Sequence, residues 1–296
     1  MKKYFILGAA ALAMAACSKD ESVNTVNNDN AIRLTASIGT QTRATLTEAE
    51  AQNTQFASGK TIFVEAYKTG ETTTYTTGNY TTGDAGAMTG SLFYPSTGEN
   101  IDICAFYPST VNSNSTSFVV GATQTSAENY QAYDLMYATK LTNKAKGSSH
   151  GLTFNHALSK IIVTIANGTG VEATDLSTIV SAVKINGTKL TGTIAITNGA
   201  ITVSGVTGDA ADITITGSNV TSQAGIIVPQ VVAAGTFITV TCNNSDYTYA
   251  LPSDKTFEAG KVYTYALTLT AAGIELQSLS IADWESEEGD TKEFTL

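Results

Sequence analysis

The amino-acid sequence predicts an all-β fold, arranged as two β-sandwich domains in tandem. Short runs rich in Thr, Val, Ile, Tyr and Phe recur beyond residue 30, and Gly and Asn separate them. Thr and β-branched residues favour strands, while Gly and Asn favour turns. Helix signals are scarce. Many short strands with turn residues between them are typical of a sandwich and not of an α/β fold.

The expected strands follow one another along most of the chain. Asn198-Gly199 separates two of them and predicts a two-residue hairpin, because both residue types tolerate the positive φ angles of a type I′ turn. The strand candidates are residues 61–67, 100–106, 158–166, 179–186, 193–197, 200–204, 236–241, 246–251 and 261–270.

Helical segments and the domain boundary are expected at only a few places. Residues 47–50 have the pattern of a capping box, and residues 126–136 have room for a turn or two of helix. Residues 144–149 are polar and contain Gly and Ser, so we expect the boundary there. The predicted domains are residues 31–148 and 149–296.

The first residues predict export. Lys2 and Lys3 precede an apolar run over residues 5–16, which is too short to cross a bilayer comfortably. Met14-Ala15-Ala16-Cys17 matches a lipobox, so residues 1–16 are expected to be removed and Cys17 to carry acyl chains. The alternative is an ordinary secretory signal with a chance cysteine. Residues 17–30 are polar and Asn-rich, which fits a flexible tether.

The next segment contains both arginines of the chain. The apolar residues Ile32, Leu34, Ala36 and Ile38 alternate with polar ones, which predicts a half-buried strand over residues 31–39. Arg43 and Ala44 follow in a polar stretch, where an Arg-specific protease would find accessible backbone. Cutting there would leave the strand held by non-covalent contacts alone, and its departure would open an apolar groove that another strand could fill. The alternative is an ordinary first strand followed by a solvated arginine.

Composition and motifs argue against several functions. The net charge of −10 disfavours nucleic acid, because phosphate neutralisation needs clustered Lys and Arg. The histidines, His150 and His156, and the cysteines Cys104 and Cys242 are too dispersed for a zinc cluster. The two cysteines fit buried thiols better than a disulfide that the sequence can place. No nucleophile elbow or phosphate loop occurs, so we expect no cofactor, no metal and no enzyme activity, with an uncharted hydrolase left as a remote alternative.

Five motifs follow one another along the chain. They are Gln124 to Ala138, Phe154-Asn155-His156-Ala157-Leu158-Ser159-Lys160, Gly225-Ile226-Ile227-Val228-Pro229-Gln230, Phe257 to Tyr265, and Ile281-Ala282-Asp283-Trp284. In this order they resemble the fimbrillin family, the type V pilins of Bacteroidales and their Mfa-like relatives. The first motif resembles the closing segment of the family's first domain.

This resemblance implies two transthyretin-like Greek-key β-sandwiches. It also implies a surface lipoprotein of the outer membrane, which is cut after Arg43 and polymerises with identical or related subunits by strand exchange. Within the family motif, His156 is expected to be a hydrogen-bonded structural residue.

The C-terminal segment, residues 274–296, is the candidate donor strand. Its apolar residues include Leu279 and Ile281, and Phe294 and Leu296 alternate again at the end. The same side chains could instead pack on their own domain. The leading hypothesis is therefore a polymerising fimbrial subunit that supports adhesion. The alternatives are a non-polymerising or tip adhesin that binds a host or bacterial ligand, and a surface glycan-degrading enzyme.

Overall fold

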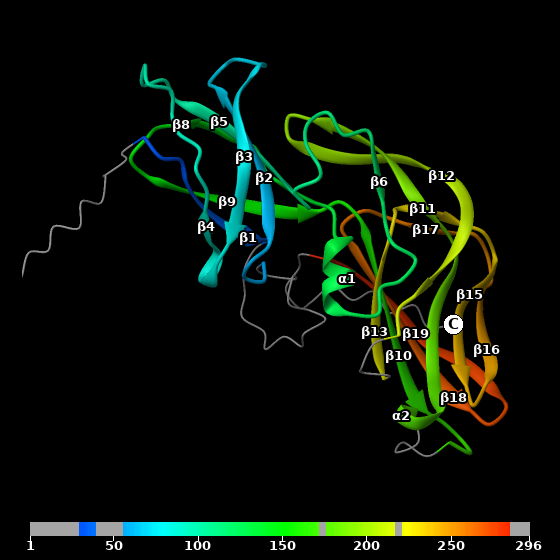
Figure 1. The fold of residues 1–296 in the computed structure, drawn as a ribbon. Coiled ribbons are helices and arrows are strands. Elements are labelled where there is room, and N and C mark those ends of the chain that lie inside the picture. The colour runs from blue at the N-terminus through cyan, green and yellow to red at the C-terminus, as the bar shows by residue number, and fades with distance from the viewer. Residues whose placement is uncertain (1–29, 40–55, 172–175, 217–220, 285–296) are drawn as a thin grey trace, which may run out of the picture.

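The computed structural model describes residues 30–39, 56–171, 176–216 and 221–284, and these fold almost entirely as β-structure (Figure 1). The helices in this part of the chain are short. They are α1 (Ala127–Ala132), α2 (Leu176–Ile179) and a 3-10 turn at Asp84–Gly86. None of the helices in the described ranges is long and apolar enough to cross a membrane. The all-β prediction is confirmed.

The first sheet has eight strands in the order β2-β3-β4-β1-β9-β7-β5-β8. Because β2 pairs with β5 as well as with β3, this sheet closes on itself and encloses a core. The strands are β1 (Arg33–Ile38), β2 (Thr61–Lys68), β3 (Thr74–Thr82), β4 (Ala87–Thr89), β5 (Ile101–Tyr107), β7 (Met136–Ala138), β8 (Leu141–Lys144) and β9 (Ser149–His156).

The rest of the chain forms two larger sheets and a short ribbon. One sheet has the order β13-β10-β18-β19, and the other has the order β12-β11-β15-β16 with β6 added to β11. The strands are β6 (Ser117–Val119), β10 (Ser159–Asn167), β11 (Val180–Thr197), β12 (Ala200–Thr214), β13 (Ser222–Ile227), β15 (Gly235–Cys242), β16 (Ser245–Leu251), β18 (Lys261–Thr270) and β19 (Gly273–Asp283). The ribbon pairs β14 (Gln230–Val232) with β17 (Lys255–Phe257).

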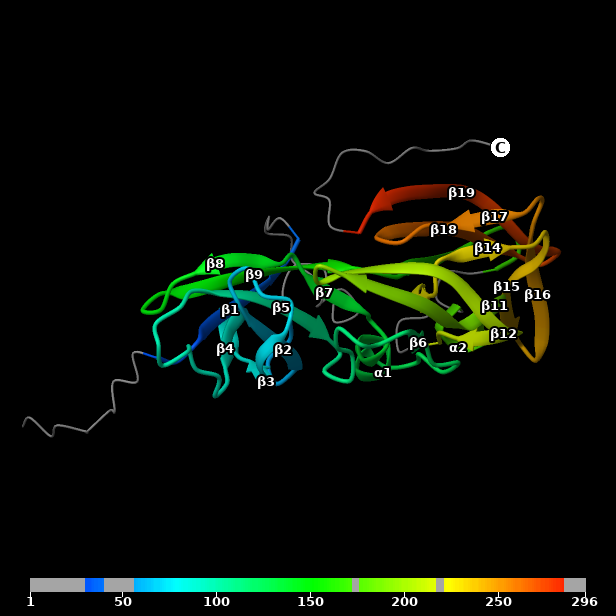
Figure 2. The same cartoon turned by 90° about the horizontal axis from the view of Figure 1, so that it is seen from above.

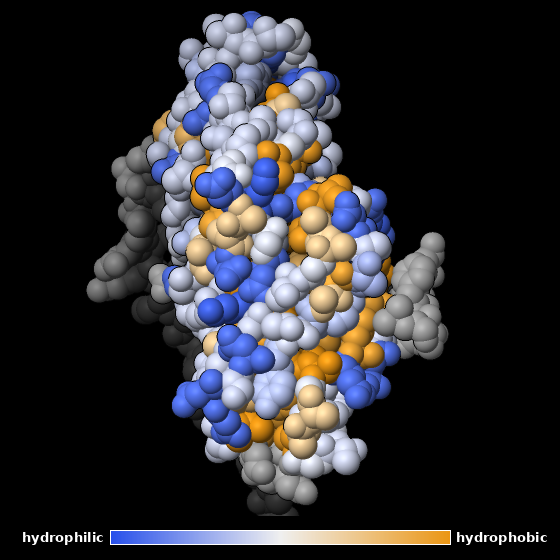
Figure 3. All heavy atoms as spheres, turned by 90° about the vertical axis from the view of Figure 1, so that its right-hand side faces the viewer, coloured by the Kyte–Doolittle hydropathy of each residue, from blue (hydrophilic) through white to orange (hydrophobic). Residues whose placement is uncertain are grey.

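The buried apolar side chains form two clusters. One lies inside the first sheet, and the other lies between the two later sheets and extends to Cys104, Phe106 and Leu135 from the earlier part of the chain. Seen from above, the two groups of strands lie end to end (Figure 2). On the side of β12, β15 and β16, apolar residues reach the surface in patches with polar residues between them (Figure 3).

Most of the predicted elements are confirmed. Every predicted strand segment lies within or overlaps an observed strand, and β1 shows the expected alternation, with its apolar side chains buried. At the predicted hairpin, Thr197 pairs with Ala200, and Asn198 and Gly199 have φ of 51° and 79°. The expected helix is α1, whose N-cap Ser126 accepts a hydrogen bond from the backbone N–H of Asn129. The candidate capping box at residues 47–50 lies outside the described residues.

One detail differs from expectation. Residues 179–186 and 193–197 belong to one long strand, β11, because bulges near Gly187 let it continue; Gly187 has φ of 73°. The domain boundary expected at residues 148/149 remains a prediction. β9 pairs with β1 and β7 in the first sheet, and the chain enters the second group of strands only after His156. Conversely, β6 comes from the earlier part of the chain but joins the later strands, because it pairs with β11.

Candidate assembly site

The first strand lies inside its sheet. β1 pairs with β4 in antiparallel fashion on one edge and with β9 in parallel fashion, over six residue pairs, on the other. Arg33 points to solvent. The four apolar side chains that the sequence singled out all face the enclosed core, with 1–5% of their surface exposed: Ile32, Leu34, Ala36 and Ile38.

Hydrogen bonds hold this strand at both ends. At the start, the hydroxyl of Tyr80 donates to the carbonyl of Ile32 at 2.7 Å, and the Ile32 N–H donates to Leu92 O at 2.8 Å. At the end, the Gly39 N–H donates to Phe154 O at 3.0 Å. Removing the strand would therefore leave unpaired backbone on both sides and an apolar floor, both of which are costly to expose.

The turn at Gly86 lies very close to the backbone of β1. Gly86 has φ of 77°, a conformation that residues with a Cβ rarely adopt. A Cβ at this position would collide with the carbonyl oxygen of Ala36. The turn that leads into β4 therefore lies directly against β1, and glycine is needed there for both reasons.

The predicted processing and lipidation residues cannot be placed. Cys17, Arg43 and Ala44 lie outside the described residues, and so do Phe294 and Leu296 of the candidate donor strand. These assignments remain predictions.

Leu279 and Ile281 lie in β19, an edge strand of its own sheet. Leu279 is paired with Tyr265 and Ile281 with Tyr263, both in β18. Both side chains are partly buried and pack on the core of the later sheets. This part of the candidate donor strand is therefore already paired and packed within its own chain.

Three of the sequence motifs meet in one buried cluster. The His156 ring stacks on Trp284, with centroids 3.9 Å apart and planes inclined by 3°. His156 Nδ1 lies 2.8 Å from Asp134 Oδ1, and both side chains are fully buried. Lys160 Nζ lies 5.7 Å from the Tyr130 ring centroid and 5.8 Å from that of Trp284. His156 is hydrogen-bonded as expected, but its pairing with Asp134 and Trp284 was not predicted.

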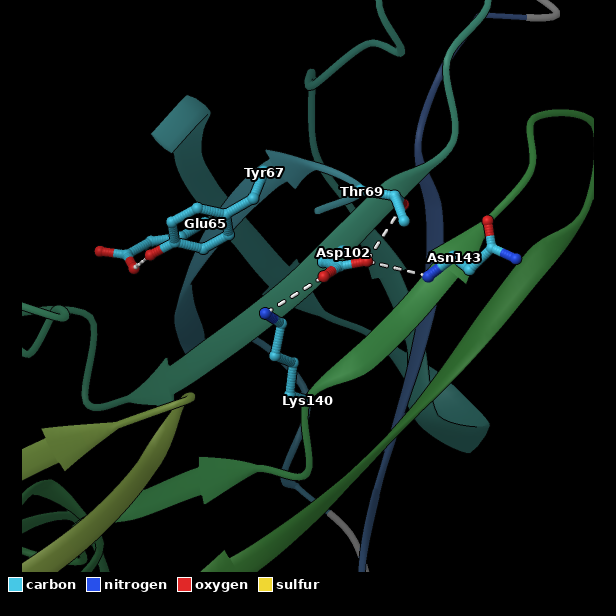
Figure 4. A network of polar contacts seen from close by, with 6 residues as sticks. All are labelled: Glu65, Tyr67, Thr69, Asp102, Lys140 and Asn143. Carbon is cyan, nitrogen blue, oxygen red and sulfur yellow. Dashed lines mark hydrogen bonds and ion pairs between the residues drawn. The ribbon is translucent and has the colours of Figure 1, made fainter. Parts of the chain in front are cut away.

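A polar network also lies on neighbouring strands of the first sheet (Figure 4). The buried carboxylate of Asp102 accepts hydrogen bonds from Thr69 and the Asn143 N–H, and it pairs with Lys140 at 3.1 Å. Burial by itself would raise the pKa of Asp102, but these partners hold it below its usual value. Next to it, Tyr67 donates to Glu65 at 2.6 Å. Sequence reasoning missed this network, although an aspartate inside the fully buried run of β5 was a signal.

Both internal cysteines are buried free thiols, as expected. Burial raises the pKa of Cys104 to about 11, which argues against a reactive thiolate. The β11–β12 hairpin covers it, since a Cβ on Gly199 would lie 2.7 Å from Cys104 Sγ.

A family model described as fimbrillin-like matches residues 42–284. The chain belongs to the fimbrillin-like family. This is a family of fimbrial and adhesion proteins and not of enzymes, so the hydrolase alternative is set aside. As a fimbrillin-like protein, the chain has a fimbrial or adhesive role.

Individual relatives of this fimbrillin-like chain come from Bacteroides. A candidate fimbrium subunit of Bacteroides uniformis, Fim1C, is 29% identical over 210 residues, which cover 67% of this chain and 66% of the relative's length. A crystal structure described as a candidate cell adhesion protein from Bacteroides uniformis has a TM-score of 0.64 at 22% identity and covers 86% of this chain and 97% of its own. One from Bacteroides ovatus has a TM-score of 0.65 at 18% identity, covering 87% and 98%. The two structures support the fold.

Proposed function

We propose that this chain is a structural subunit of a surface fimbria, in which β1 is replaced by a strand from a neighbouring subunit. The observation that carries the proposal is the position of β1, a short strand bounded by β4 and β9, with its apolar side chains and that of the preceding Ile32 all buried. An incoming strand with apolar residues at alternate positions could pair with β4 and β9 and bury its apolar side chains in the same core.

The energetics favour a stable contact between subunits joined by such a strand. Burying the three large side chains of β1 contributes roughly 5–9 kcal/mol, at ~1.5–3 kcal/mol each. Each ladder hydrogen bond adds ~0.5–1.5 kcal/mol. A donor strand that matched this burial would restore most of that stabilisation, whereas an empty groove would expose apolar surface to water.

The proposal includes a route to the surface. The chain is exported as a lipoprotein, anchored in the outer membrane through acyl chains on Cys17, and cut between Arg43 and Ala44. The lipobox and the following polar segment support the first two steps, and Arg43 in a polar stretch after β1 supports the third.

The donor is the tail that follows Trp284. Leu279 and Ile281 are paired within their own sheet, so donating them would strip β19 from β18. Residues 285–296 end with the alternating residues Phe294 and Leu296, and using them leaves β19 in place.

N-terminal sequencing of assembled surface material tests the processing step. The expected first residue is Ala44. Arg43→Lys should block cutting by an Arg-specific protease, and Arg33→Lys is the matched control because it changes the other arginine of the segment. Fibres whose subunits all begin with a lipidated Cys17 would contradict the proposal.

A chain that ends at Trp284 tests the donor. It should remain folded and lipidated, but it should give monomers in place of fibres. The matched control is the full chain with Glu287→Gln and Glu288→Gln, which alters the tail while keeping its apolar residues. Fibres that persist after truncation would show that the donor is elsewhere.

A second candidate is a non-polymerising or tip adhesin, which binds a host or bacterial ligand. The pairing of β19 within its own chain favours it, and the two structural relatives are described as cell adhesion proteins. This candidate predicts surface material that retains residues 31–43 and binds cells as single subunits. The sequencing experiment separates the two.

A further inference from the structure

Trp284 anchors the C-terminal end of β19. It directly follows β19 and only 4% of it is exposed. Its backbone N–H donates to Gly260 O at 2.8 Å, while its ring lies nearly parallel to that of His156. Aromatic rings at this separation attract each other beyond the effect of burial. The end of β19 is therefore held by the backbone and the ring of Trp284.

The partner of this tryptophan belongs to the strand that borders β1. His156 is the last residue of β9, whose residues 149–154 pair with β1. The last pair joins Ile38 to Phe154, and Phe154 also accepts the hydrogen bond from Gly39. Only Asn155 separates this pair from His156. His156, which stacks on Trp284, thus lies two residues beyond the last pair between β1 and β9.

The backbone beyond His156 is tied to the same region. The Ala157 N–H donates to Leu135 O at 2.9 Å, and the Gly260 N–H donates to Leu158 O at 2.8 Å. Gly260 in turn accepts the hydrogen bond from Trp284. On its other side, the His156 ring contacts Asp134. A shift at the end of β9 therefore reaches Trp284 through the ring stack and through the Gly260 turn.

We propose that the His156–Trp284 stack couples occupancy of the β1 position to the anchoring of Trp284 at the end of β19. When Ile38 or its replacement is in place, Phe154 is packed, the end of β9 is fixed and Trp284 stays stacked. When that end of the position is empty, β9 frays, the ring of His156 moves and Trp284 loosens. The coupling element is thus a defined pair of rings between two sites, as coupling between sites requires.

The consequence for assembly rests on the proposed function. In a subunit whose β1 position is empty, Trp284 and the end of β19 are held loosely, so donating the residues that follow would cost additional conformational entropy. In a filled subunit, the end of β19 is fixed. Growth would therefore proceed from filled subunits, and empty ones would seldom join one another.

The only tryptophan of the chain allows a direct test, because its emission reports on Trp284 alone. The test uses full-length, unassembled protein and two matched variants at opposite ends of β1. Ile38→Ala should shift the emission to longer wavelength and increase acrylamide quenching. Ile32→Ala removes the same atoms at the other end of the strand, where the Ile32 backbone bonds to Tyr80 and Leu92, and should leave the emission unchanged.

A third variant, His156→Ala, removes the ring stack that links the two sites. In a His156→Ala background, Ile38→Ala should cause no further shift, since the stack is already absent. Equal shifts for both isoleucine variants, no shift for either, or a shift that persists without His156 would each overturn the coupling. If the alanine variants do not fold, judged by circular dichroism, Ile38→Val and Ile32→Val take their place. Since no fibres are involved, failure of the coupling and failure of strand exchange are read separately.

Discussion

β1 and β19 begin with similar sequences but have different places in the fold. Ile32-Arg33-Leu34 opens one region and Ile274-Glu275-Leu276 opens the other. β1 has paired neighbours on both edges, and its apolar side chains are almost fully buried. β19 ends the order of its sheet, pairs with β18 and keeps its apolar side chains partly exposed.

This difference shows that an alternating pattern alone does not say how much a strand contributes. β19 contains a bulge, because Leu276 pairs with Leu267 while Ser278 pairs with the adjacent Ala266. The bulge keeps Leu276 and Leu279 on the core side. Loss of an edge strand shortens a sheet by one strand, whereas loss of β1 would leave a gap between β4 and β9 and expose the core. The following predictions rank the two regions by this criterion.

The largest expected effect comes from a charge placed in each strand. Leu34→Asp buries a carboxylate with no partner among apolar side chains, which costs about 3–5 kcal/mol. Leu279→Asp places the same group on a partly exposed edge strand, where water reaches it, and should cost about half as much. Urea denaturation of both variants gives the comparison. Equal losses would mean that β19 matters to the fold as much as β1.

The next effect concerns the backbone that lies against β1. Gly86→Ala forces a Cβ onto the Ala36 carbonyl at a positive φ, so the strand or the turn must move. We expect a loss of about 2–3 kcal/mol, larger than the usual 1 kcal/mol or so for such a φ alone. Gly98→Ala is the matched control, because Gly98 has φ of 88° but open space around it. Thermal unfolding should show Gly86→Ala to be clearly the worse. Similar losses would argue against a tight fit at β1.

Tyr80 gives a smaller, pH-dependent effect on the same strand. Tyr80→Phe leaves the Ile32 carbonyl without its donor and should cost about 1–2 kcal/mol at neutral pH. Burial raises the pKa of Tyr80 to about 12, against about 10 in an unfolded chain. Between those values the folded state keeps a proton that the unfolded state releases, so stability falls as pH rises.

The alkaline test compares two proteins, because other buried tyrosines such as Tyr107 also have raised pKa values. The wild type should lose its advantage over Tyr80→Phe as the pH rises from about 10 to about 12. Urea midpoints measured across this range provide the check. A constant difference would show that the hydroxyl of Tyr80 does not stabilise β1 through its proton.

Local patterns predicted the elements well. β1 was predictable because alternation reports which side chains face a core, and the hairpin at Asn198-Gly199 was predictable because few residues tolerate its φ angles. A short helix was expected within residues 126–136, and the structure shows that Ser126 caps α1. These signals all lie within a few residues of the structure that they specify.

Long-range pairing was not predictable from the sequence alone. Nothing in β1 specifies its parallel partner β9, which lies more than 100 residues further along the chain. Residues 179–186 and 193–197 were predicted as two strands, whereas the structure continues β11 through bulges near Gly187. His156 and Trp284 were both noticed as motif residues, yet only the fold brings their rings together.

The smallest effect is expected at the end of β19. Lys261 forms an ion pair and hydrogen bond with Asp283, and this contact raises the pKa of the lysine. Both side chains are substantially exposed, at 33% and 61%, so the pair should contribute less than about 1 kcal/mol. Asp283→Asn should shift the urea midpoint only slightly, and less at high salt, where screening weakens the wild-type pair. A loss of stability as large as that of Tyr80→Phe would show that this ion pair holds the end of β19 tightly. The ring stack of Trp284 would then not be the main anchor of β19, and the contrast between β1 and β19 would weaken.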